Sequence, residues 1–284
     1  MRTGFSAVLS IVLGLGLPVA TGSLWAQAEQ VERERAEYRA WLERAPNSPL
    51  AALAQRRLES RVVLGPPESD IPLPGLETHT LEDGRLVRLT GPAGRRPLPR
   101  NRLLPLGPYR MFLSGTRGRT VVTVYDSAPR PKALSFYPYD PDLVFTAKLV
   151  PPKKSGTVRV LTVDGVEVEA TEAGTFRVPL GAEGVDLRVR RIPDAGTEES
   201  ELEIYFRDET NDAGTYPAGR FVSLQPERDG RYVLDLNRAR SPFCAYSSVY
   251  PCPIPWSGNA ISAAVTAGER YEGGGLEVPK PGAP

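Results

Sequence analysis

The chain has 284 residues, and its 35 lysines and arginines nearly balance its 34 acidic residues. The formal net charge of +1 excludes a strong uniform field over the whole chain, so we expect no nucleic-acid partner. The single histidine excludes a zinc site built on several imidazoles, and we expect no cofactor and no metal site.

Residues 1–28 have the pattern of a secretory signal peptide. Arg2 provides a short basic region, residues 5–20 are mostly apolar, and the sequence AQA at 26–28 offers a cleavage site before Glu29. The alternative is an uncleaved membrane anchor, although the apolar run is short for a span and is interrupted by Gly and Pro. We therefore expect an exported protein, periplasmic or secreted, with no stable membrane insertion after cleavage.

Residues 29–62 are predicted to form a helical segment. Ser48 followed by Pro49 suits the cap and the first position of a helix. Apolar residues fall at helix-compatible spacing before and after this pair, at Val31, Tyr38, Trp41, Leu42, Leu50, Leu53 and Leu58. This pattern indicates a helical hairpin or a broken helix that lies on a β body.

The remaining chain reads as short strands between turns. Asp83-Gly84 and Asp164-Gly165 are hairpin signals, and no helical pattern separates the strands. We predict a mostly β fold, an antiparallel sandwich or open barrel with an N-terminal helical segment. We expect a small β subdomain, a main β domain with a polar cluster and a Cys loop, and a flexible tail, over residues 63–115, 116–272 and 273–284.

Familiar catalytic motifs are missing from the sequence. It has no G-x-S-x-G, no P-loop and no G-x-G-x-x-G at a strand–helix junction. His79 is expected to be a surface or half-buried strand residue. Cys244 and Cys252 lie eight residues apart, and in an exported protein they indicate a structural disulfide. The alternatives are a thiolate nucleophile, for which His79 lies far away in sequence, and a pair of metal ligands.

The run from Phe206 to Glu269 holds the candidate site. It concentrates Asp, Asn, Thr, Tyr, Arg and Pro at predicted strand ends. If these strands are neighbours, the side chains converge at one end of a sheet, where Arg220 can pair with a carboxylate. The candidate ligand-binding cluster comprises Asp208, Thr210, Tyr216, Arg220, Asp235, Asn237, Tyr246 and Glu269.

This run resembles an uncharacterised bacterial family, domain of unknown function 1684. The resemblance is carried by FRDET at 206–210, TYPAGRF at 215–221, LDLNRA at 234–239, PFCAY at 242–246 and AGE at 267–269. A looser pattern upstream includes residues 124–151 and NSPL at 47–50. The resemblance implies a shared architecture and a shared polar cluster, and it names no activity.

Three functions suit such a cluster. It can be a polar network that fixes the Pro- and Cys-rich loop, as in a purely structural or interaction module. It can bind a small polar ligand such as a sugar or an amino-acid derivative, with walls from Tyr246, Tyr250 and Trp256. Two carboxylates beside a tyrosine can also serve a carboxylate-dependent hydrolase. A calcium site at 208–214 is a variant of the binding interpretation, although its spacing departs from an EF-hand loop. We predict ligand binding, with the other two as alternatives.

Overall fold

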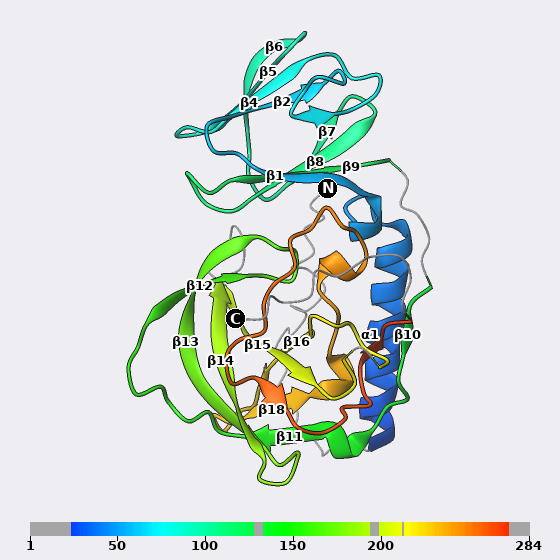
Figure 1. Ribbon diagram of the computed structural model, residues 1–284, viewed down its shortest axis with the longest axis vertical. Coiled ribbons are helices and arrows are strands. Elements are labelled where there is room, and N and C mark those ends of the chain that lie inside the picture. Colours follow the sequence, from blue (N-terminus) through cyan, green and yellow to red (C-terminus); the bar gives the residue numbers. More distant parts are fainter. Residues whose placement is uncertain (1–23, 128–132, 194–198, 212, 273–284) are drawn as a thin grey trace. The chain divides into compact units, whose positions relative to one another are not determined.

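The computed structural model describes residues 24–127, 133–193, 199–211 and 213–272 (Figure 1). Its sheets are mainly antiparallel, and its one long helix is α1, Leu24–Arg44. The predicted fold class, mostly β and antiparallel with an N-terminal helical segment, is confirmed. Most of the predicted signal peptide lies outside the described residues, and the predicted cleavage site at 26–28 falls in the first turns of α1. In the part of the chain that the structure describes, the helices contain no membrane-spanning candidate.

The second half of the predicted helical segment is a strand. Ser48 does cap a helix, because its hydroxyl accepts a hydrogen bond from the Leu50 amide at 3.1 Å. That helix is a single 3-10 turn, η2 Pro49–Ala51, and β1 Ala52–Arg57 follows at once. The helix predicted around Leu53 and Leu58 is therefore wrong. Both leucines pack into a β core, and this tertiary packing overrides the helical spacing of the apolar residues.

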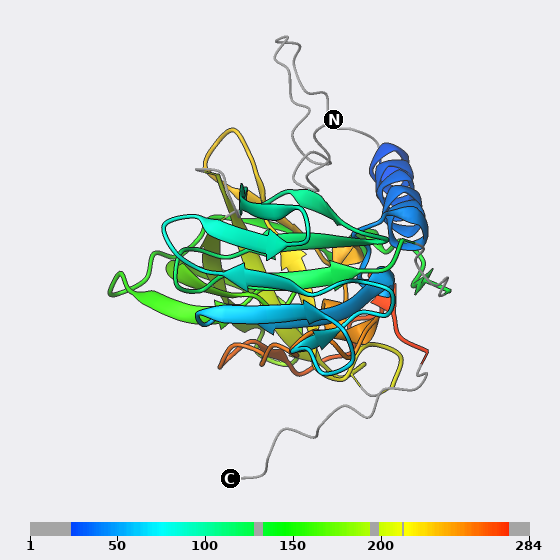
Figure 2. The ribbon, with the colours of Figure 1, turned by 90° about the horizontal axis from the view of Figure 1, so that it is seen from above.

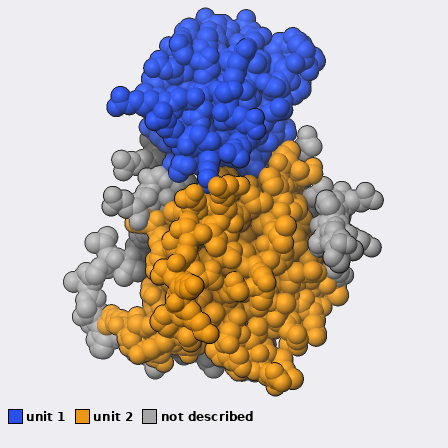
Figure 3. Space-filling view, turned by 60° about the vertical axis from the view of Figure 1, so that its left-hand side comes forward, with its two compact units in different colours: residues 1–19, 40–132, 194–197 blue, residues 20–39, 133–193, 198–284 orange. Residues whose placement is uncertain are grey.

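The chain divides into two compact units (Figure 3). Among the described residues, unit 1 covers 40–127, and unit 2 covers 24–39, 133–193 and 199–272. The predicted boundary between residues 115 and 116 falls inside unit 1, because β8 Tyr109–Ser114 pairs with β9 Val121–Tyr125.

Unit 1 is a β-sandwich, and Figure 2 shows its strands running side by side. One sheet has the order β1, β9, β8 and β7 Leu103–Leu106. The other has the order β3 Ile71–Pro72, β2 Arg61–Gly65, β4 His79–Glu82, β5 Val87–Gly91 and β6 Gly94–Leu98. Buried residues of both sheets share one core, among them Leu64, Leu81, Met111 and Val122, so the sheets pack face to face.

Two local predictions in unit 1 are confirmed. Asp83-Gly84 lies in the turn between β4 and β5. His79 begins β4 and is half-buried, and its Nδ1 lies 2.7 Å from the Glu77 carbonyl.

Unit 2 is built on one large sheet. Its order is β12 Thr157–Leu161, β13 Glu167–Val178, β14 Val185–Pro193, β15 Ser200–Asp208 and β16 Arg220–Ser223, with β19 Ala260–Ile261 parallel to β15. A smaller sheet has the order β11 Val144–Ala147, β18 Tyr232–Asp235 and β17 Gln225–Pro226. A two-stranded ribbon joins β10 Ser135–Phe136 to β20 Glu269–Arg270. Asp164-Gly165 turns β12 into β13, as predicted.

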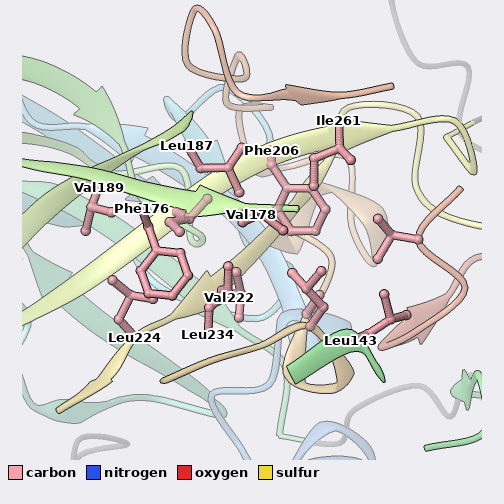
Figure 4. Packing of buried hydrophobic residues seen from close by; sticks show 14 of the residues in the cluster. Leu143, Phe176, Val178, Leu187, Val189, Phe206, Val222, Leu224, Leu234 and Ile261 are labelled. Carbon is pink, nitrogen blue, oxygen red and sulfur yellow. The ribbon is translucent and has the colours of Figure 1, made fainter. Parts of the chain in front are cut away.

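The alternation of β15 separates two environments. Leu202, Ile204 and Phe206 lie in the main core (Figure 4). Other residues of the large sheet, together with residues of β11 and β18, complete this core. Tyr205 lies in a second buried cluster with Phe221 and Trp256. Because side chains alternate along a strand, Asp208 lies on the side of the main core, and Glu203 lies on the side of Tyr205.

Candidate functional site

The eight predicted cluster residues all lie in unit 2, where they form three hydrogen-bonded groups. The first group contains Asp208, Thr210, Tyr216 and Arg220. The second contains Asp235 and Asn237, and the third contains Tyr246 and Glu269. Seven of the eight are buried, and Tyr246 alone among them is half-buried.

Asp208 organises the loop that follows β15. Its Oδ1 accepts hydrogen bonds from the Thr210 amide at 2.9 Å, the Thr210 hydroxyl at 2.5 Å and the Val265 amide at 3.2 Å. The carboxylate therefore closes its own turn and also holds a distant segment, as an Asp at the start of a turn commonly does.

Arg220 faces this carboxylate from the first position of β16. One Nη donates to Asp208 Oδ2 at 2.8 Å and to the Val265 carbonyl at 3.0 Å, and the other donates to the Ala267 carbonyl. Both side chains of the ion pair are fully buried. Of the three carboxylates in the predicted cluster, Asp208, Asp235 and Glu269, the one that Arg220 binds is Asp208. The pair is enclosed by protein, which favours the interpretation as an internal polar network.

Asn211 completes the first group, and the sequence interpretation missed it. Its side-chain carbonyl accepts from the Asp208 amide at 2.7 Å, and its Nδ2 donates to the Tyr216 carbonyl at 2.6 Å. Both Asp208 oxygens and the Asn211 oxygen thus already face protein donors, which leaves few free oxygens for a cation. The described residues contain no group of three or more His, Cys, Asp or Glu side chains that could hold a metal.

The second group connects α1 to the end of β18. Asp235 caps the 3-10 turn η4 Leu236–Arg238 by accepting from the Asn237 amide at 3.0 Å. Asn237 exchanges two hydrogen bonds, each of 2.8 Å, with the backbone of Asp140. Arg238 donates to Asp235 and, at 2.7 Å, to Glu34 of α1. These contacts satisfy backbone groups and dock a helix, so they also favour a structural role.

The third group reaches toward the surface. Glu269 accepts hydrogen bonds from the Ser241 amide at 2.9 Å and from the Tyr246 hydroxyl at 2.6 Å. The Tyr246 hydroxyl lies 3.2 Å from that of Tyr38 on α1, and both tyrosines are half-buried. Burial raises the pKa of Glu269, and burial together with the Glu269 charge raises the pKa of Tyr246. The result is a chain of ionisable groups from a buried carboxyl to a partly exposed phenol.

Arg240 extends the third group across unit 2. It pairs with Phe221 through its backbone, and its side chain is half-buried. Although burial opposes its charge, the nearby Tyr38 and Glu203 raise the pKa of Arg240. Burial raises the pKa of Glu203 to about 7, against the opposing effect of Arg240. We call Tyr38, Glu203, Arg240, Tyr246 and Glu269 the Arg240 group.

The predicted disulfide is wrong, because the structure has Cys244 and Cys252 as free thiols. The short loop does bring the sulfurs together, and the Tyr216 hydroxyl lies 3.4 Å from each. The hydrogen bond from the Cys244 thiol lowers the pKa of Cys252 to about 6. The eight-residue spacing therefore correctly predicted that the two cysteines lie close together. They are joined by hydrogen bonds and not by a disulfide.

Sequence reasoning found the Asp208 network better than it found the Arg240 group. Asn211 stood in the same polar loop as Thr210 and could have been included. Glu203 had a signal in the strand ELEIYF, where a carboxyl alternates with core residues. Tyr38 and Arg240 had no signal, because they meet only after α1 docks against unit 2.

Residues 131–270 match the family model described as a protein of unknown function, DUF1684. The chain belongs to the DUF1684 family. The chain is also similar to an uncharacterized protein from Haloarcula marismortui, whose solution NMR structure is 36% identical over 49% of this chain and 76% of that chain, with a TM-score of 0.42. A search of the curated proteins found no match.

The DUF1684 match covers β10 to β20 and therefore most of unit 2. It contains all eight predicted cluster residues and both cysteines, and it leaves out the sandwich of unit 1. The resemblance seen in the sequence is thus confirmed, and the family description names no ligand and no activity.

Proposed function

We propose that this DUF1684 protein is exported and that unit 2 binds a small polar ligand at the Arg240 group. The observation that carries the proposal is that the hydrogen-bonded Tyr38, Tyr246 and Glu269 gather on unit 2 together with Arg240, a half-buried cation whose charge interacts with Tyr38, Tyr246 and Glu203. Functional sites commonly gather ionisable groups whose pKa values are shifted by burial and by one another.

The chemistry of these side chains suggests the ligand class. A guanidinium binds a carboxylate, and carboxyl and phenol groups bind hydroxyls or an amine. An amino-acid derivative or an acidic sugar offers both kinds of group. Of the eight residues predicted from the sequence, the half-buried Tyr246 and the buried Glu269 belong to the Arg240 group, and the other six are buried outside it.

A thermal-shift screen with amino acids and sugars tests the binding proposal. A ligand present at 100 times its Kd stabilises the folded state by about 2.7 kcal/mol, so a genuine ligand raises the melting temperature measurably. The shift should disappear in Arg240→Gln and persist in Arg231→Gln, which changes an exposed arginine of the same unit. No shift with any compound, or the same shift in both variants, would favour the structural alternative.

The hydrolase alternative rests on Glu203. A carboxyl with a pKa of about 7 is suited to donate a proton near neutral pH, and Glu269 offers a second carboxyl. Chromogenic glycosides and esters test this alternative. Hydrolysis that is lost in a folded Glu203→Gln variant would support it, and equal rates in the variant and the wild type would exclude Glu203 as the acid.

Export is tested separately by sequencing the N-terminus of the protein recovered outside the cytoplasm. The signal pattern predicts a mature chain that begins at Glu29. Recovery of a chain that begins at Met1 would contradict cleavage.

A further inference from the structure

Unit 1 has a net positive charge, although the net charge of the whole chain is close to zero. Residues 40–127 contain 13 arginines, no lysine and eight acidic residues, whereas the rest of the chain has 22 basic and 26 acidic residues. The sequence-wide balance is therefore the sum of a basic part and an acidic part, and overall charge is a poor guide to the partners of either.

The basic residues of unit 1 gather at one end of the sandwich. Four turns lie there, because each follows a strand that runs in the same sense: β1 to β2, β4 to β5, β6 to β7 and β8 to β9. Residues 57–61, 83–86, 99–102 and 115–120 together contain seven arginines and two acidic residues. We call these four segments the arginine end.

The opposite end has the opposite charge. Its connections, residues 66–78, 92–93, 107–108 and 126–127, contain four acidic residues and no lysine or arginine. A sandwich whose connecting segments carry only acidic charges at one end and mostly arginines at the other is a polar object that an anionic surface would orient.

A buried aspartate ties three of the arginine-bearing turns together. Asp83 binds Arg100 at 2.8 Å, the Gly118 amide at 3.1 Å and the Thr120 hydroxyl at 2.9 Å. Its own amide donates to the Ser60 carbonyl at 3.0 Å, which attaches the fourth turn. The Asp83 charge is thus neutralised internally by Arg100, and the remaining arginines are held on a fixed platform.

The outward side chains of this platform combine charge with one apolar residue. Five of the seven arginines are exposed: Arg57, Arg61, Arg85, Arg102 and Arg117. Leu86 stands beside Arg85 at the tip of the β4–β5 turn and is 50% exposed, one of the few large apolar side chains so exposed among the described residues. Arginine binds phosphate in a bidentate manner, and an exposed leucine suits the boundary between lipid headgroups and acyl chains.

We propose that the arginine end docks unit 1 on an anionic phospholipid surface, with Leu86 entering the headgroup boundary. The charge complementarity favours a phosphate-rich partner, and Leu86 favours a lipid surface over a nucleic acid, whose backbone offers no apolar boundary. This inference is independent of the ligand proposed for unit 2. It concerns reversible contact with the membrane surface and not insertion.

Vesicle sedimentation of the full-length protein tests the proposal. Vesicles of phosphatidylcholine alone are compared with vesicles that also contain about 30% phosphatidylglycerol, and the neutral vesicles report any binding by the apolar N-terminal residues. We expect stronger binding to the anionic vesicles, and we expect about 0.5 M NaCl to release the charge-dependent part because salt screens it.

Charge reversal locates the contact. Arg85→Glu with Arg117→Glu should lower the partition coefficient on anionic vesicles by about tenfold or more. Arg88→Glu with Arg96→Glu changes two exposed strand arginines by the same charge and should have a clearly smaller effect. Leu86→Ser should weaken binding several-fold while leaving its salt dependence unchanged.

Three results would overturn the proposal. Equal binding to both kinds of vesicle would remove the role of charge. Equal losses in the two double variants would remove the role of the arginine end. Binding to a DNA oligonucleotide or to heparin, without a preference for anionic vesicles, would assign the surface to a soluble polyanion.

Discussion

Arg220 shows most clearly what a single side chain does in unit 2. It is fully buried and binds Asp208 together with the carbonyls of Val265 and Ala267. A buried ion pair gains little over an apolar pair, but the loss of one partner leaves an uncompensated charge in the interior. Its role in the fold follows from this asymmetry.

We predict that Arg220→Ala lowers the free energy of unfolding by about 3–5 kcal/mol, because Asp208 would remain buried without its counter-ion. Urea unfolding measures the change. The control is Arg231→Ala, which breaks the exposed pair with Asp229 and should cost far less, because solvent screens that pair. Similar losses in the two variants would contradict the role assigned to Arg220.

Glu203 makes stability depend on pH. Its pKa rises from an ordinary value near 4.5 to about 7 in the folded protein, so the folded state holds the proton more tightly than the unfolded chain. The protonated carboxyl therefore stabilises the folded state fully below the pKa that Glu203 has in the unfolded chain. This stabilisation is lost as the pH rises through the pKa of Glu203 in the folded protein. We predict that unfolding becomes easier from about pH 5 to pH 7.5, by up to about 1.4 kcal/mol per pH unit.

Urea unfolding at several pH values measures this slope. Glu203→Gln should reduce it, because the amide does not titrate, while Glu201→Gln, which changes an exposed carboxyl two residues earlier on the same face of β15, should retain most of it. A slope that is unchanged in Glu203→Gln would assign the pH dependence to another group, such as Glu269, whose pKa burial also raises.

Among the elements, α1 is held to unit 2 by a buried arginine as well as by a buried apolar residue. Arg35 is buried and donates to the carbonyls of Tyr137 and Asn237, each at 3.0 Å. Val31 is the buried apolar residue one turn earlier. Since Tyr38 belongs to the Arg240 group, the docking of α1 also completes the proposed ligand surface.

We predict that Arg35→Ala speeds amide hydrogen exchange over residues 24–38 and lowers the free energy of unfolding by about 1.5–3 kcal/mol, the range for hydrogen bonds to a charged group. Arg33→Ala is the matched control on the same helix. Arg33 is exposed and pairs with Glu29, so its loss should cost about 0.5 kcal/mol or less. Unchanged exchange in Arg35→Ala would show that other contacts hold the helix.

At the scale of the whole molecule, two separate cores stabilise two units. Phe176 lies in the core of unit 2, and Leu113 lies in the core of the unit 1 sandwich. The units also differ in charge. The DUF1684 family model matches most of unit 2 and does not match the sandwich of unit 1. We therefore expect a substitution in the core of one unit to destabilise that unit and to leave the stability of the other unchanged.

We predict that Phe176→Ala destabilises unit 2 by about 3–5 kcal/mol and speeds hydrogen exchange in β12 to β16, while the strands of unit 1 keep their protection. Leu113→Ala should have the reverse pattern. Hydrogen exchange read by mass spectrometry on both variants measures this. Loss of protection in both units from either substitution would show that the chain unfolds as one cooperative body.

The sequence by itself determined the mostly β architecture, the hairpins at Asp83-Gly84 and Asp164-Gly165, and the polar run of the DUF1684 unit. These features are local, since turn residues and alternation act over a few positions. It could not exclude a helix around Leu53, because a buried strand and a helix share such apolar spacing, and only packing against distant strands decided the outcome.

Only the tertiary structure decided which polar groups are internal and which face outward. The sequence does not distinguish Asp208 and Arg220 from Tyr246 as candidate ligand-binding residues. In the structure, Asp208 and Arg220 are buried, whereas Tyr246 is half-buried. The arginine end could not be predicted from the sequence either, because its four turns are far apart in the chain. They lie at the same end of the sandwich only because antiparallel strands alternate in direction. Charge and burial are properties of a surface, and the fold creates that surface.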